Sequence, residues 1–203
     1  MFAERGIEAV SLRDVSAAAG QRNHSAAQYH FGDRGGLVAA VYESRMRLVN
    51  EWRQSALDRL EEAGRLDDVA GLVAATVLPL VQLVTTTPCW YARFLARVRW
   101  DDFAAGVVAD LPAAAAFRRT HRLLLQALLP LSLETRRSRV DQVVTLTVGT
   151  LAGWEAARHG ARRRLGAAAL ADELLSTTVA VAGAPELTLT TTSTDSSRGG
   201  NRP

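Results

Sequence analysis

Polar side chains that are able to hydrogen-bond to nucleic acid gather near the start of the chain. They are Ser11, Arg22, Asn23, His24, Ser25, Gln28, Tyr29, His30 and Arg34. Asparagine and glutamine amides pair with the edge of adenine, whereas arginine, serine, histidine and tyrosine donate hydrogen bonds to phosphate oxygens. These residue types predict DNA contact, provided that a structural element presents them together to one groove.

Two short helices separated by a glycine are predicted to position these side chains. Ser11 begins the first, over residues 11–19, because its hydroxyl can accept from the amide of Asp14, whose carboxylate also favours the positive helix end. Gly20 ends this helix, since glycine adopts the left-handed conformation without steric penalty. A second helix is expected over residues 24–31. This order is typical of a helix-turn-helix, in which the second helix enters the major groove.

The segment from Phe2 to about Val41 resembles the DNA-binding domain of the TetR family of bacterial repressors. The stretches that carry the likeness are Phe2-Ala-Glu-Arg-Gly6, Ser11-Leu-Arg-Asp-Val15, Ala18-Ala19-Gly20, Tyr29-His30-Phe31 and Arg34-Gly-Gly-Leu37. The resemblance implies a DNA-binding domain over residues 1–45 and a helical ligand-binding and dimerisation domain over residues 46–184. It also implies a homodimeric repressor that binds a palindromic double-stranded DNA operator and responds to an unknown small-molecule effector.

The resemblance also implies roles for four residues. Ser11 stands where a capping serine or threonine touches phosphate, and Arg34 stands where a lysine usually grips one. Tyr29 and His30 stand where an aromatic pair contacts the DNA backbone. Arg34 on an exposed helix start and His24 and His30 on the surface are otherwise solvated, whereas the Tyr29 ring is expected to pack with its hydroxyl outward. Phe31 is expected in the core.

Two departures from the family pattern affect these expectations. Gln21 replaces the usual valine, and Tyr29 lies nine residues after Gly20 instead of seven, so the turn or the second helix is longer. The first helix is short because Met1 directly precedes Phe2. We hypothesise that the native start lies upstream. The alternative function is a helical ligand-binding and dimerisation protein whose DNA binding is impaired by its short N-terminus.

The rest of the chain is also expected to be helical, which makes the protein all-α. Apolar residues recur with the helical period, and no stretch alternates with period two over the length of a strand. Prolines and glycines separate the predicted helices, which cover residues 2–5, 36–63, 68–86, 88–103, 112–129, 133–159 and 166–183. Residues 185–203 are rich in Thr, Ser and Gly, and are predicted to form a disordered tail.

Two further groups of residues each have two interpretations. Trp90, Tyr91 and Phe94 line either the core or a ligand cavity, in which Arg97 fixes an acidic group. An apolar stripe along the last two helices forms either part of the intramolecular core or a four-helix dimer interface. In the second case Gly149 and Gly153 would allow another helix to approach closely. The interface residues would be Val144, Leu151, Trp154, Leu170 and Leu174.

Composition excludes several classes of protein. The 203 residues include one cysteine, so a disulfide framework and a multi-cysteine metal cluster are excluded. The four histidines form no metal-spaced pair, and neither a nucleotide-binding glycine loop nor a nucleophile elbow is present, so we expect no enzyme, no cofactor and no metal. The apolar stretch Val69 to Val84 is too short to cross a membrane, and no signal peptide is evident, which predicts a cytoplasmic protein without a membrane partner. The formal net charge of +3 is too small to indicate DNA binding on its own.

Overall fold

Helices make up all the regular secondary structure in the part of the chain that the computed structural model describes, residues 1–21, 23, 25–158 and 165–186. The predicted all-α class is therefore confirmed for these residues. The helices are α1 (Phe2–Arg5), α2 (Leu12–Ala18), α3 (Ala26–Phe31), α4 (Arg34–Glu62), α5 (Val69–Thr86), α6 (Tyr91–Arg99), α7 (Asp102–Ala109), the short 3₁₀ helix η1 (Pro112–Ala114), α8 (Ala115–Ala127), α9 (Leu133–Ala157) and α10 (Ala167–Ala182). The predicted tail lies outside the described residues except for its first two, which are exposed.

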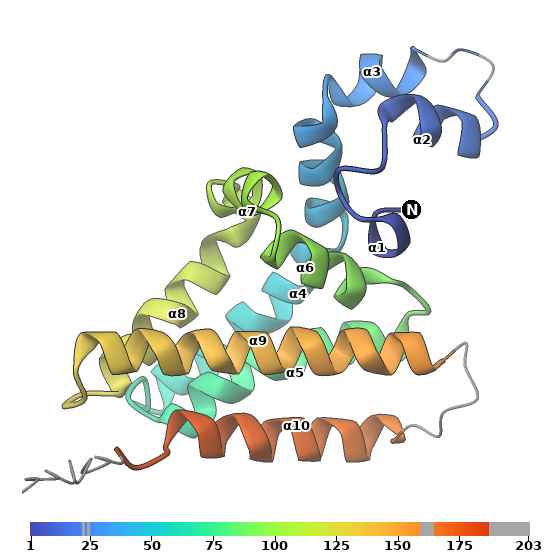
Figure 1. Cartoon of the computed structure of the whole chain (residues 1–203). Coiled ribbons are helices and arrows are strands. Elements are labelled where there is room, and N and C mark those ends of the chain that lie inside the picture. Colours follow the sequence, from blue (N-terminus) through green and yellow to red (C-terminus); the bar gives the residue numbers. More distant parts are fainter. Residues whose placement is uncertain (22, 24, 159–164, 187–203) are drawn as a thin grey trace, which may run out of the picture.

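The short helices α1, α2 and α3 lie together at one end of the molecule, and α5, α9 and α10 lie at the other (Figure 1). The 29-residue helix α4 runs from the first group into the second. Its beginning packs against α3 and α7, and the remainder packs against α5 and α8. The expected domain boundary between residues 45 and 46 therefore falls inside one continuous helix.

Helix α5 is the centre of the larger group. Its side chains Leu72, Val73, Leu83 and Val84 are fully buried, because α4, α8, α9 and α10 all pack against it. By length and composition, this is the one helix among the described residues that could cross a membrane. More than half of it, 56%, is buried inside the protein, as in the core helix of a folded body.

The prediction of one helix over residues 88–103 is wrong, because the helical conformation is interrupted at Asp101. Asp101 has an extended backbone, and its carboxylate accepts a hydrogen bond of 2.9 Å from the amide of Ala104. Aspartate at this position starts a new helix, since its oxygen satisfies an amide that lacks a partner in the first turn. The segment is therefore two helices, α6 and α7, and α7 continues beyond the predicted end.

The predicted glycine stop at Gly20 is confirmed. Gly20 has a positive φ angle of 68°, which other residues adopt only with strain, and Gly32 ends α3 in the same way with a φ of 73°. Helix α4 starts at Arg34, two residues earlier than predicted, because Asp33 caps it through the amide of Gly36.

Candidate nucleic-acid interface

Helix α2 begins with a capping box at Ser11, as the sequence predicts. The Ser11 hydroxyl accepts a hydrogen bond of 3.1 Å from the amide of Asp14, and the Asp14 carboxylate accepts one of 3.0 Å from the amide of Ser11. The bond from the Ser11 amide, and a second of 2.8 Å that the Ser11 hydroxyl donates to the same carboxylate, lower the pKa of the Asp14 carboxyl below its ordinary value. The hydroxyl that the family likeness assigns to phosphate therefore also fixes the start of α2.

A buried hydroxyl joins α2 to α3. The side chain of Ser16 accepts a hydrogen bond of 3.2 Å from the amide of Ala27, in the first turn of α3. First-turn amides have no partner inside their own helix, so this bond satisfies one of them and fixes the position of the short helix. Sequence reasoning missed Ser16. The available signal was a serine on the inner face of α2, where an apolar residue is expected.

Three polar residues of α3 face solvent together. Gln28, Tyr29 and His30 are all exposed, and the edge of the Tyr29 ring meets His30 at a centroid distance of 5.4 Å. Tyr29 is 87% exposed, so the expectation that its ring packs is wrong. Phe31, by contrast, is half-buried and packs against the core as expected. The tip of the molecule thus presents an amide, a phenol and an imidazole on one short helix.

Asn23 and Ser25, two further residues predicted to contact DNA, lie in the turn before α3. Asn23 and Ser25 are exposed, and the side-chain oxygen of Asn23 accepts a hydrogen bond of 3.0 Å from the amide of Ser25. This bond holds the turn and delays the start of α3 to Ala26, two residues later than predicted. Arg22 and His24 lie outside the described residues.

Arg34 lies at the start of α4, where its guanidinium contacts other parts of the chain. Its guanidinium carbon lies 5.0 Å from the centroid of the Phe103 ring on α7, and its Nη1 donates a hydrogen bond of 3.4 Å to the carbonyl of Glu8. Arg34 is half-buried in this arrangement. A phosphate contact would therefore compete with the Phe103 ring and the Glu8 carbonyl.

The turn between α3 and α4 is too tight for any side chain at Gly36. A Cβ atom placed there would overlap the carbonyl oxygen of Phe31. The carboxylate of Asp33 already occupies the amino end of α4, where it accepts a hydrogen bond of 2.8 Å from the Gly36 amide. A helix amino end attracts an external anion, and the structure fills this one with a carboxylate of the chain itself.

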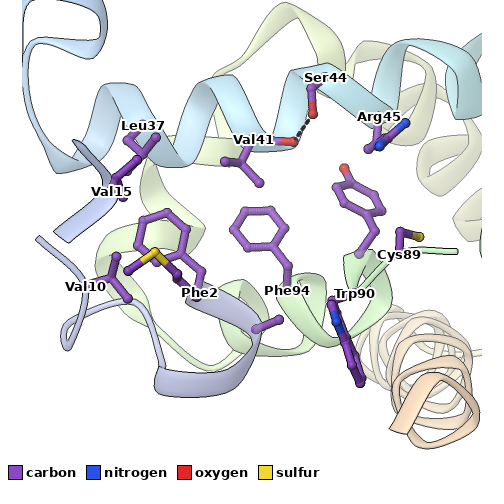
Figure 2. A pocket seen from close by; sticks show the side chains of 13 residues that line it. Phe2, Val10, Val15, Leu37, Val41, Ser44, Arg45, Cys89, Trp90 and Phe94 are labelled. Carbon is purple, nitrogen blue, oxygen red and sulfur yellow. Dashed lines mark hydrogen bonds between the residues drawn. The ribbon is translucent and has the colours of Figure 1, made fainter. Parts of the chain in front are cut away.

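Three of the four residues predicted to bind a ligand line one cavity. Trp90, Tyr91 and Phe94 border a space of about 330 Å³ between α6, α4 and the first residues of the chain (Figure 2). Its walls are mostly apolar, with Ser44 and Arg45 supplying the polar side chains of α4. Arg97 is exposed and lines a different groove beside Trp100, so it is not the residue that would fix an acidic group in this cavity.

The cavity borders a tightly packed part of the core. The Tyr91 hydroxyl donates a hydrogen bond of 2.9 Å to the carbonyl of Tyr42, and burial raises the pKa of both phenols. Cys89 lies at the edge of the same cavity, and burial raises the pKa of its thiol. Because a raised pKa leaves the thiol protonated, Cys89 behaves as a small, partly buried apolar residue and not as a reactive thiol.

A buried carboxylate holds α6 against α9. Glu155 is 1% exposed, and its two oxygens accept hydrogen bonds of 3.1 Å and 2.9 Å from the amides of Ala92 and Arg93 in the first turn of α6. Burial raises the pKa of the Glu155 carboxyl, and the two amides oppose that rise. Sequence reasoning missed this residue, although an acidic side chain directly after the buried Trp154 was a signal.

Four of the five residues predicted to form a dimer interface are buried within the chain itself. Leu151, Trp154, Leu170 and Leu174 lie in the core between α9 and α10 and their neighbours, and Val144 is half-buried against it. Their side chains are already covered by the same chain, as the intramolecular alternative predicts. A second copy of the chain could contact only the residues beside them. Gly149 and Gly153 are exposed, and a Cβ atom at either would meet nothing within 4 Å.

In comparisons with known proteins, no family model and no curated protein matches the chain.

Proposed function

We propose that the chain is a DNA-binding transcriptional regulator of the TetR type. In this proposal it acts in the cytoplasm as a homodimeric repressor of a palindromic operator and releases DNA when it binds a small molecule. The observation that supports it most is the geometry of α2 and α3. Two short helices meet through a glycine turn at the tip of the molecule, and the second one exposes Gln28, Tyr29 and His30.

The proposal assigns different tasks to the exposed residues. Gln28 lies on the outward face of α3, where its amide suits a base edge in the major groove. Tyr29 and His30 suit the phosphates on either side, which position a protein without reading sequence. The Ser16 hydrogen bond to α3 supports this arrangement, because a recognition helix of only six residues needs an external anchor.

Dimerisation belongs to the proposal because two recognition helices must reach successive major grooves, about 34 Å apart. The outer face of α9 offers a surface for it. Gly149 and Gly153 stand one helical turn apart on that face and leave room for a second helix to approach closely. Glycine inside a helix costs about 1 kcal/mol relative to alanine. A helix–helix contact that is possible only without side chains at these two positions would account for both glycines.

The proposed response to a ligand is a shift between dimer geometries. A ligand that binds one geometry more tightly raises its population, and release from DNA follows if the recognition helices no longer match the operator spacing. The apolar cavity beside Trp90 and Phe94 supports this part of the proposal, because α4 and α6 both border it.

A mobility-shift assay with the DNA upstream of the gene tests the proposal. We expect specific binding that weakens steeply as salt rises, since phosphate contacts release counter-ions. Gln28→Ala should reduce the preference at one base position, whereas a variant of a phosphate contact, Tyr29→Phe, should weaken binding to all sequences alike. Identical behaviour of the two variants would show that the division into base and phosphate contacts is wrong.

The second candidate is a helical ligand-binding and dimerisation protein whose DNA binding is impaired. One observation favours it: the Arg34 guanidinium already contacts Phe103 and Glu8, and Asp33 occupies the amino end of α4. Both features reduce the affinity of this turn for phosphate. The same assay separates the candidates, because this protein would dimerise and bind a ligand without shifting any DNA.

A further inference from the structure

The cavity beside α6 follows one face of α4. Leu37, Val41 and Arg45 line it at intervals of four residues, so they lie one after another along that face. From Leu37 to Arg45 the helix rises by about 12 Å, at 1.5 Å per residue. Val15 lies at the Leu37 end of the cavity, and Cys89 lies at the Arg45 end (Figure 2). This shape fits a slender molecule, and the volume of about 330 Å³ suits a small one.

Aromatic rings form the wall that faces α4. The rings of Phe2 and Phe94 have centroids 6.1 Å apart, and those of Tyr91 and Phe94 lie 5.8 Å apart. All three side chains are buried, so they give the cavity a rigid apolar wall. An apolar chain placed between these rings and α4 would leave water, which favours binding.

Arg45 is the charged side chain of this lining, and no residue neutralises it. It is exposed, and none of the ion pairs in the described part of the chain includes it. No carboxylate lines the cavity. A guanidinium without a counter-ion offers two parallel donors, which a carboxylate binds through both oxygens.

Other polar groups at the same end already have acceptors. The Ser44 hydroxyl donates a hydrogen bond of 2.8 Å to a carbonyl of its own helix, and the Tyr91 hydroxyl donates one of 2.9 Å to another carbonyl of α4. The thiol of Cys89 lies 3.6 Å from Oε1 of Glu155, a carboxylate behind the lining that disfavours an anion beside the thiol. The head of a bound acid is therefore best placed at Arg45.

A wider groove elsewhere on α4 lacks this charge balance. It has a volume of about 930 Å³ and lies between the middle of α4 and the start of α8. Glu43 and Glu51 line it beside Arg47, and the Arg47 guanidinium lies 3.7 Å from the Glu51 carboxylate. An acid in this groove would meet two carboxylates and an arginine that is already paired, so the cavity beside α6 is the better site.

We propose that the cavity beside α6 binds an unbranched medium-chain carboxylate, a fatty acid, with its head on Arg45 and its chain between α4 and the rings of Phe2 and Phe94. The chain would contact α1, α4 and α6 together, so it would join the short helices at the tip to the larger group. The inference rests on the proposed function only in regarding the acid as the effector. It also moves the cationic partner once expected at Arg97 to Arg45.

Calorimetry on the full chain tests the proposal with butyrate, octanoate, dodecanoate and the neutral octanamide. From butyrate to octanoate we expect the affinity to rise about fourfold for each added methylene, because each one leaves water. Dodecanoate is longer than the lined face of α4 and should bind no more tightly than octanoate. Octanamide has the same shape without the charge, and it should bind at least about tenfold more weakly than octanoate.

Three variants locate the acid. Arg45→Met should weaken octanoate at least about tenfold and leave octanamide unchanged, because only the ion pair is lost. Arg47→Met, an exposed arginine of the same helix outside the cavity, is the matched control and should change octanoate affinity by no more than about twofold. Val41→Phe fills the cavity, keeps Arg45 and should abolish binding of both ligands. Thermal melting shows that each variant is folded.

Cys89 offers a second readout, because it is the only cysteine of the chain and lines the cavity. Octanoate should slow its alkylation by iodoacetamide in the original protein and in Arg47→Met. At the same octanoate concentration, the protection should be lost in Arg45→Met. Alkylation that octanoate does not slow in the original protein would place the acid elsewhere and overturn the proposal.

Four calorimetric results would also overturn it: equal affinity for octanoate and octanamide, unchanged octanoate affinity in Arg45→Met, an affinity that keeps rising to dodecanoate, or no binding of any carboxylate. A mobility shift without any acid tests the regulator separately. Octanoate binding without a DNA shift would keep this inference and reject the proposed function, and the reverse result would do the opposite.

Discussion

The guanidinium carbon of Arg34 lies 5.0 Å from the centroid of the Phe103 ring, which joins the first turn of α4 to α7. Glu8 adds a carbonyl on the same guanidinium. The side chain that the family resemblance assigns to phosphate is therefore held by α7, an element outside the two short helices α2 and α3. Any phosphate contact by Arg34 depends on how firmly Phe103 holds it.

Phe103→Leu should strengthen DNA binding if Arg34 contacts phosphate. A cation–π contact at a partly exposed site is worth about 0.5–1 kcal/mol, so the dissociation constant should fall about two- to fivefold. Fluorescence anisotropy across a salt series measures this change. Trp100→Leu is the control, because that ring contacts the guanidinium of Arg99 instead. If both variants bind as the unsubstituted protein does, Arg34 does not leave the ring to reach DNA.

Ser16→Ala should destabilise the protein and loosen α3. The substitution leaves the Ala27 amide buried without a partner, which costs about 1–3 kcal/mol. Chemical denaturation gives the stability, and amide hydrogen exchange gives the local opening of residues 26–31. Ser25→Ala is the matched control, since the Ser25 hydroxyl makes no capping bond. Equal exchange in the two variants would show that Ser16 does not hold α3.

Gly36→Ala should disrupt the turn between α3 and α4. The added methyl group would overlap the Phe31 carbonyl oxygen, and backbone atoms cannot move aside cheaply. We expect a loss of about 1–3 kcal/mol in the free energy of unfolding, measured by denaturation. A variant as stable as the original protein would mean that this turn relaxes freely.

Gly153→Ala separates folding from dimerisation. Within the chain the added methyl group meets nothing, so helix propensity alone should stabilise the monomer by about 1 kcal/mol. If the outer face of α9 is the dimer interface, the same methyl group separates the two helices and weakens the dimer. Sedimentation velocity measures the dimer and thermal melting measures the fold. An unchanged dimer would place the interface elsewhere.

The buried carboxyl of Glu155 predicts a pH dependence of stability. Its pKa in the folded protein lies above the ordinary value of 4.5, so the folded state holds the proton more tightly than the unfolded state does. Stability from this group is therefore fully present below pH 4.5 and is lost as the pH rises through the folded pKa. The free energy of unfolding of the original protein and of Glu155→Gln is measured from pH 4 upward. The stability of the original protein should fall relative to that of Glu155→Gln as the pH rises. The opposite slope would mean that the two amides outweigh burial.

Sequence reasoning predicted the local features of the fold well, because they depend on neighbouring residues. The cap at Ser11 and the stop at Gly20 follow from backbone conformation and short hydrogen bonds. The break at Asp101 was missed, since the apolar period continues on both sides of it and only the capping aspartate marks the boundary.

The tertiary partners of the candidate site could not be predicted from the sequence. Ser16 and Ala27 are eleven residues apart, Glu155 and Arg93 are 62 apart, and nothing in the spacing pairs them. Leu151 and Leu174 fit an outer stripe as well as an inner one, because helical periodicity gives the width of an apolar face and not what covers it.

Helix α4 connects the groove between its middle and the start of α8 to the tip of the molecule that carries α3. From Asn50 to Arg34 the helix spans about 24 Å, at 1.5 Å per residue. A tilt of about 5° at the groove would move the other end by about 2 Å, for a helix of this rise and rigidity. A tilt of this size would change the position of α3 by about the H···O length of a hydrogen bond, because α3 is attached at the start of α4.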